Sequence, residues 1–111
     1  MFKLQKQGAV KVIVGDQPLT KESTAAALRA CEEALTLGQP KLVFDLQAVP
    51  LLDSAGLEML LDVRDRCQER GGALNLAAAT PLCRDILTAT QVADQFAIFD
   101  DVLSAVGSFA Q

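Results

Sequence analysis

Hydrophobic and polar residues alternate along the chain in two distinct periods. Runs rich in Val, Ile, Leu and Phe, bounded by turn residues, predict strands over residues 2–5, 9–14, 41–46, 73–78 and 96–99. Apolar residues spaced three and four apart predict a helix between Thr20 and Gly38 and further helices over residues 55–69, 82–88 and about 102–109. Strands and helices therefore follow each other in the order ββαβαβαβα.

Turn and capping residues set the expected boundaries. Gly8 separates the first two strands and predicts a hairpin. Thr20 is expected to cap the first helix and Gly38 to end it. The Thr80-Pro81 pair is typical of a helix start.

This order of elements predicts an α/β fold. Strands that alternate with helices are joined by right-handed crossovers, which make the sheet mainly parallel, and the first hairpin makes it mixed. We expect one domain over residues 1–111, with about five strands and about four helices. The run 41–46 is almost continuously apolar, as in a strand that is covered on both faces.

Composition narrows the possible functions. The net charge is −4 and no Lys/Arg cluster is present, so neither a nucleic acid nor an anionic lipid surface is an expected partner. Histidine is absent, and the three cysteines form no CxxC pair, so we expect no metal site, no cofactor and buried reduced thiols. The start of the chain does not read as a signal peptide and no run is long enough to span a bilayer, which predicts a cytoplasmic protein without membrane insertion.

The best candidate for a functional site is the segment Leu51-Leu52-Asp53-Ser54-Ala55-Gly56-Leu57. An apolar stretch runs into a polar turn that opens a helix, with Ser54 at or beside the N-cap. A phosphate on Ser54 would lie at the positive end of that helix and next to the negative Asp53. The small residues Ala55 and Gly56 would let the backbone of another protein come close. An Asp-Ser pair before a helix is also an ordinary cap, so the turn alone does not distinguish a switch from a structural cap.

The arrangement LVFDLQAVPLLDSAGLEMLLDVRDRCQERGGALNL resembles the STAS domain family, of the type that includes anti-sigma factor antagonists. That family is similar in having a strand that ends in Asp-Leu, a short apolar link, D-S-x-G-L, a helix, Gly-Gly and a strand. The resemblance extends over nearly the whole chain, from the first hairpin through LCRDILTATQVADQFAIFDDVLSAV.

The resemblance implies a partner-switching regulator and no catalytic residue in this chain. It places a phosphorylation site at Ser54. The implied partners are an anti-sigma factor that is a GHKL-type serine kinase and a metal-dependent serine phosphatase, and the ATP and the metal belong to those partners. No small-molecule ligand is expected. The expected partner-binding residues are Asp53, Ala55, Gly56, Leu57, Glu58, Asp16 and Thr20.

The loop after the second strand departs from the family pattern. Many antagonists carry Gly-Glu-Leu-Asp there, whereas this chain has Gly15-Asp16-Gln17-Pro18-Leu19-Thr20, one residue longer. The family's acidic position would fall on Thr20, with Asp16 as a possible substitute.

Two alternatives to the antagonist are another binding role on the same fold and an enzyme. A STAS subunit that binds the ATPase of an ABC-type phospholipid transporter also has D-[ST]-A-G-L, with which Ala55 agrees; a stressosome-like or biofilm regulator would still use Ser54. An enzyme is disfavoured, because Ser54 and the cysteines have no histidine to activate them and no glycine-rich phosphate loop follows the first strand.

Overall fold

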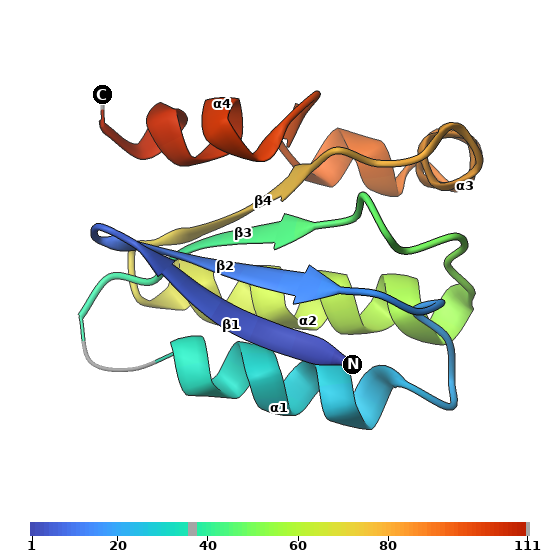
Figure 1. Cartoon of the computed structure of the whole chain (residues 1–111), viewed down its shortest axis with the longest axis horizontal. Helices are drawn as coiled ribbons and strands as arrows, with labels where there is room; N and C mark the ends of the chain where they lie inside the picture. Colours follow the sequence, from blue (N-terminus) through green and yellow to red (C-terminus); the bar gives the residue numbers. More distant parts are fainter. Residues whose placement is uncertain (36–37, 111) are drawn as a thin grey trace.

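A computed structural model describes residues 1–35 and 38–110 of the chain. A five-stranded sheet forms its centre (Figure 1). The strands are β1 (Phe2–Gln7), β2 (Val10–Gly15), β3 (Lys41–Asp45), β4 (Ala73–Ala77) and β5 (Ile98–Phe99). The α-helices are α1 (Thr24–Ala34), α2 (Ser54–Glu69), α3 (Pro81–Ala89) and α4 (Val102–Gly107), and the short 3-10 helices are η1 (Val92–Gln95) and η2 (Ser108–Ala110).

The strands lie in the sheet in sequence order, β1-β2-β3-β4-β5. β1 and β2 are antiparallel, and every later pair is parallel. Gln7 pairs with Val10, so the hairpin turns over two residues, and Gly8 adopts φ +63° there. A positive φ is easily reached by glycine, which lacks the Cβ that strains other residues in this region. The predicted mixed α/β fold and the order ββαβαβαβα are confirmed.

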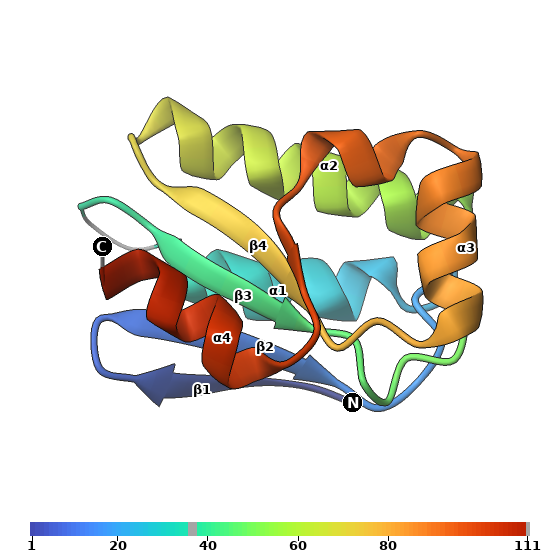
Figure 2. The ribbon, with the colours of Figure 1, turned by 90° about the horizontal axis from the view of Figure 1, so that it is seen from above.

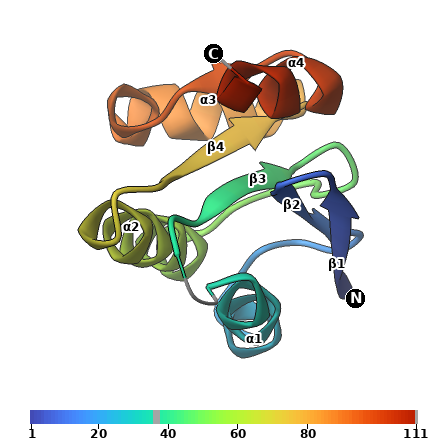
Figure 3. The same ribbon diagram turned by 90° about the vertical axis from the view of Figure 1, so that its left-hand side faces the viewer.

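Helices cover both faces of the sheet. α1 and α2 lie on one face and α4 on the other, as the end-on view shows (Figure 3). α3 lies beyond the ends of the parallel strands (Figure 2). The carboxyl ends of β2, β3 and β4 therefore open onto one edge of the molecule, where the loops that lead into α1, α2 and α3 meet.

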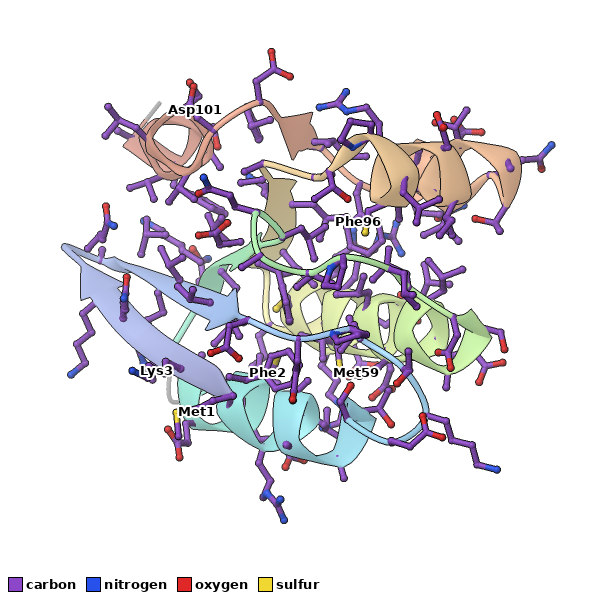
Figure 4. The ribbon with its side chains drawn as sticks, turned by 45° about the vertical axis from the view of Figure 1, so that its right-hand side comes forward. Met1, Phe2, Lys3, Met59, Phe96 and Asp101 are labelled. Carbon is purple, nitrogen blue, oxygen red and sulfur yellow. The ribbon has the colours of Figure 1, made fainter. Side chains whose placement is uncertain are left out.

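The hydrophobic core has a large and a small part. On the α1 and α2 face, the Phe44 ring packs with Ile13, Leu60 and other fully buried aliphatic residues. The Phe2 ring meets Phe44 edge to face, with centroids 6.2 Å apart, and Met59 is buried on the same side of the sheet (Figure 4). On the opposite face a smaller cluster of valines and alanines packs against α4. Side chains of β3 alternate between the two clusters, which explains its continuous apolar sequence.

Several boundaries differ from the sequence expectation. β5 is limited to Ile98–Phe99, two residues shorter than predicted. Residues 92–95 form a 3-10 helix that the hydrophobic pattern did not predict. α1 ends at Ala34, and the part of the predicted helix at residues 36 and 37 lies outside the described residues. The predicted start of α3 is confirmed, since the Thr80 side chain accepts a hydrogen bond from the Cys83 amide and Pro81 is the first helical residue.

Thr20 does not cap α1, so that expectation was wrong. The helix begins at Thr24 with Ser23 as the N-cap residue, and Ser23 makes no side-chain capping bond. Instead the Ser23 hydroxyl donates to the Pro18 carbonyl at 2.8 Å and accepts from the Thr20 amide at 3.0 Å. Residues 18–23 thus form an internally bonded turn ahead of the helix.

The core should respond strongly to the loss of its largest side chain. Phe44→Ala removes a fully buried ring at the centre of the sheet and should lower the free energy of unfolding by about 3–5 kcal/mol. Leu103→Ala is the matched control, because Leu103 is 78% exposed and should change stability by less than about 0.5 kcal/mol. Urea unfolding followed by far-UV circular dichroism measures both. Similar values for the two variants would contradict the described core.

Candidate functional site

The start of α2 presents Ser54 to solvent. Asp53 is the N-cap residue, in an extended conformation, and its Oδ1 accepts the Gly56 amide at 2.8 Å. Ser54 is the first helical residue and is exposed. Within the described part of the chain its hydroxyl makes no hydrogen bond. The cap is therefore supplied by Asp53 alone, which leaves the serine oxygen free for chemistry.

The same aspartate also holds the loop between β2 and α1. Asp53 Oδ2 accepts the Lys21 amide at 2.9 Å, and the Asp53 amide donates to the Leu19 carbonyl at 3.3 Å. The Leu19 amide donates in turn to the Leu51 carbonyl at 3.0 Å, and Leu19 forms a parallel bridge with Leu52. Two segments about thirty residues apart in sequence are thereby joined by main-chain hydrogen bonds. We call this arrangement, made by residues 19–21 and 51–56, the aspartate clamp.

Gly56 has an internal role in the aspartate clamp. A Cβ atom on Gly56 would lie 2.2 Å from the Leu19 carbonyl oxygen, a separation that cannot exist without backbone movement. The sequence suggested that a small residue here would admit the backbone of a partner. The space is occupied by the chain's own loop instead, and both Gly56 and Leu57 are buried.

The other expected partner-binding residues lie on α2 and on the loop between β2 and α1. Glu58 is exposed one turn further along α2, and Ala55 is half-buried between them. Thr20 is half-buried on the loop, where its Oγ1 donates to Glu22 Oε2 at 3.0 Å. Asp16 also lies on this loop, but its carboxylate is paired with the N-terminal ammonium group of Met1. The sequence did not single out Leu19 or Lys21, because their roles depend on a contact with α2.

Hydrogen bonds stabilise the ionised form of Asp53. The Gly56 amide, and after it the Lys21 amide, stabilise the ionised carboxylate and hold the pKa of Asp53 below its ordinary value of 3.8. The group next to Ser54 is therefore a carboxylate at neutral pH.

The cysteine thiols are unsuited to nucleophilic chemistry. All three are free and buried. Burial raises the pKa of Cys31 to about 12 and that of Cys67 to about 11, and it also raises the pKa of Cys83. At neutral pH these groups are thiols, whereas the thiolate is the reactive form.

The family model of the STAS domain matches residues 1–105. The chain belongs to the STAS domain family. Among the described residues, every helix is too short or too polar to span a bilayer. A comparison with curated proteins finds no match for this STAS domain.

Solved structures agree with the family assignment at the level of the fold. An anti-sigma-factor antagonist domain protein from Planctomyces limnophilus is 22% identical, with a TM-score of 0.90 over 99% of this chain and 98% of that one. The anti-sigma factor antagonist SpoIIAA, in its unphosphorylated form, is 14% identical, with a TM-score of 0.83 over 99% and 96%. The murine anion transporter Slc26a9 is 16% identical, with a TM-score of 0.80 over 96% of this chain but 18% of that chain.

Because Leu19 lies so close to Gly56, adding a single methyl group at residue 56 should lower the stability of the fold. Gly56→Ala should lower the free energy of unfolding by about 1–3 kcal/mol, because the loop must move away from α2. Gly107→Ala is the matched helical control, since no atom outside its own stretch of helix lies within 4 Å of its Cβ position, and it should be neutral or stabilising. Urea unfolding curves compare the two. Equal stability of both variants would contradict the described packing of the loop.

The lowered pKa of Asp53 predicts a pH-dependent contribution to stability. The unfolded chain binds a proton at this carboxyl more readily than the folded one, so the contribution is present above about pH 4 and is lost as pH falls through the folded pKa. Asp53→Asn should therefore destabilise the protein at pH 6, and its difference from wild type should shrink toward pH 2.5. Urea midpoints at the two pH values test this. A difference that stays constant would show that the charge of Asp53 does not support the fold.

Proposed function

We propose that this STAS domain is an anti-sigma factor antagonist switched by phosphorylation of Ser54. In the unphosphorylated form it binds an anti-sigma factor and so releases a sigma factor. The observation that carries the proposal is the exposed Ser54 hydroxyl, which has no internal hydrogen bond and directly follows the clamped Asp53. A kinase can reach this oxygen without unfolding α2, since the cap does not depend on it.

The surroundings of Ser54 give phosphorylation a physical effect. Carboxylates are already present at Glu22 on the loop, at Asp53, the N-cap residue of α2, and at Glu58 in the second turn of α2. A phosphoserine would add about −1.5 to −2 charge at neutral pH. A partner whose contact patch is acidic or apolar would then face local repulsion and the cost of desolvating a phosphate.

The proposed partners rest on the resemblance of the D-S-x-G-L segment to that of the family's antagonists. The anti-sigma factor is a GHKL-type serine kinase that modifies Ser54 and then dissociates, and a metal-dependent serine phosphatase restores the hydroxyl. The cycle takes place in the cytoplasm. The likeness in fold to SpoIIAA, an anti-sigma factor antagonist solved in its unphosphorylated form, supports the antagonist role.

The proposed contact surface consists of side chains from two elements. Ser54, Ala55 and Glu58 come from α2, and Thr20 comes from the loop before α1. Gly56 and Leu57 support this surface without being part of it. Gly56 lets the loop pack against α2, and Leu57 packs in the core. The role of this STAS domain is thus to present a preformed surface, with the chemistry supplied by its partners.

Substitution of Ser54 tests the switch. Ser54→Asp should bind the anti-sigma factor at least about tenfold more weakly, a loss of about 1.4 kcal/mol, and Ser54→Ala should bind as the unmodified protein does. Neither change should alter the fold, because Asp53 supplies the cap. The matched control is Ser104, an exposed serine near the start of α4, whose substitution by Asp should leave binding unchanged. Affinities are measured by calorimetry with the anti-sigma factor recovered by pull-down.

Phosphate-affinity electrophoresis of protein from the native cells supplies the second measurement. Wild type should give a slower band that is missing in Ser54→Ala and retained in Ser104→Ala. If no such band appears under several growth conditions and Ser54→Asp binds as wild type does, the switch is wrong. Recovery of a transporter ATPase in the pull-down would then favour the constitutive subunit of an ABC-type phospholipid transporter.

A further inference from the structure

We propose that Lys21 binds the phosphoryl group on Ser54 and holds it against the loop between β2 and α1. The inference rests on the proposed function, because it concerns the same modified serine. It adds a residue of this chain that recognises the phosphorylated state, at a position that the family motif does not include.

The main chain holds Lys21 next to Ser54. Its amide donates to Asp53 Oδ2 at 2.9 Å, and the Leu19 carbonyl, two residues earlier, accepts from the Asp53 amide at 3.3 Å. Asp53 directly precedes Ser54, so their Cα atoms are about 3.8 Å apart. The backbone of Lys21 is therefore fixed within a short distance of the serine, whatever rotamer the lysine side chain adopts.

The lysine ammonium group is available for a new partner. Lys21 is exposed, and its side chain makes no ion pair or hydrogen bond within the described residues. The other charged residues of the loop and of the first two turns of α2 are acidic: Asp16, Glu22, Asp53 and Glu58. Among these residues Lys21 is thus the single cation that can offset the charge of a phosphoserine.

The two groups match in chemistry and reach. Lysine carries three N–H donors on a flexible four-carbon stem, and a phosphoserine offers three strong acceptor oxygens. A charge-assisted hydrogen bond between them would direct the phosphate toward the loop. The phosphate would then lie over the part of the proposed contact surface that Thr20 contributes. A single phosphate would thus change the contact surface both on α2 and on the loop before α1.

The pKa of the phosphate reports this contact directly. Phosphoserine is incorporated at residue 54 by genetic code expansion, and the phosphorus resonance is followed by NMR from pH 4 to pH 8. A nearby cation favours the dianion and lowers the second phosphate pKa, whereas Asp53, Glu22 and Glu58 raise it. Lys21→Ala should therefore raise the midpoint by about half a pH unit, the size expected of an exposed ion pair.

Two further variants make the result specific. Lys21→Arg keeps the charge and should retain the low midpoint. Lys6→Ala removes an exposed lysine on β1, close to the hairpin turn, and should leave the midpoint as in wild type. A Lys21→Ala midpoint equal to wild type, or an equal shift in Lys6→Ala, would overturn the inference. Because the phosphate is incorporated during synthesis, the outcome does not depend on whether cells phosphorylate Ser54, and the electrophoresis above tests that separately.

Discussion

The geometry of the candidate site depends on one carboxylate. Asp53 accepts an amide from its own helix with one oxygen and an amide from a distant loop with the other. Each bond is charge-assisted, and together they start α2, fix the loop and orient Ser54 toward solvent. Both carboxylate oxygens of Asp53 thus accept hydrogen bonds from within the chain. Because Asp53 caps the helix, Ser54 does not have to.

Sheet topology explains why these segments meet. In parallel strands the carboxyl ends lie at one edge, so the loops that follow β2 and β3 leave the sheet side by side. Leu19 and Leu52 continue the pairing of those two strands by one isolated parallel bridge. The aspartate clamp is in effect an extension of the sheet beyond its last regular hydrogen bonds.

Elements with a local cause could be predicted from the sequence, and elements with a tertiary cause could not. Thr80 caps α3 through a bond three residues away, so its local pattern suffices. Ser23 and Thr20 are equally plausible caps by residue type, and the choice follows from how the loop bonds to Pro18 and α2. From the sequence, Gly56 could serve either contact with a partner or internal packing. The structure decides for packing, because a Cβ atom on Gly56 would lie 2.2 Å from the Leu19 carbonyl oxygen.

The rigidity of the aspartate clamp also limits how a switch at Ser54 can work. Leu19 is fully buried, and its carbonyl fills the space above Gly56, so the loop cannot shift without opening the core. Closely packed interiors resist such displacements. On the proposed function, a phosphate added to the exposed serine oxygen therefore changes the charge of a surface whose backbone stays in place. Recognition by the partner then depends on electrostatics at the start of α2, and Lys21 and Asp53 set the field that the phosphate meets.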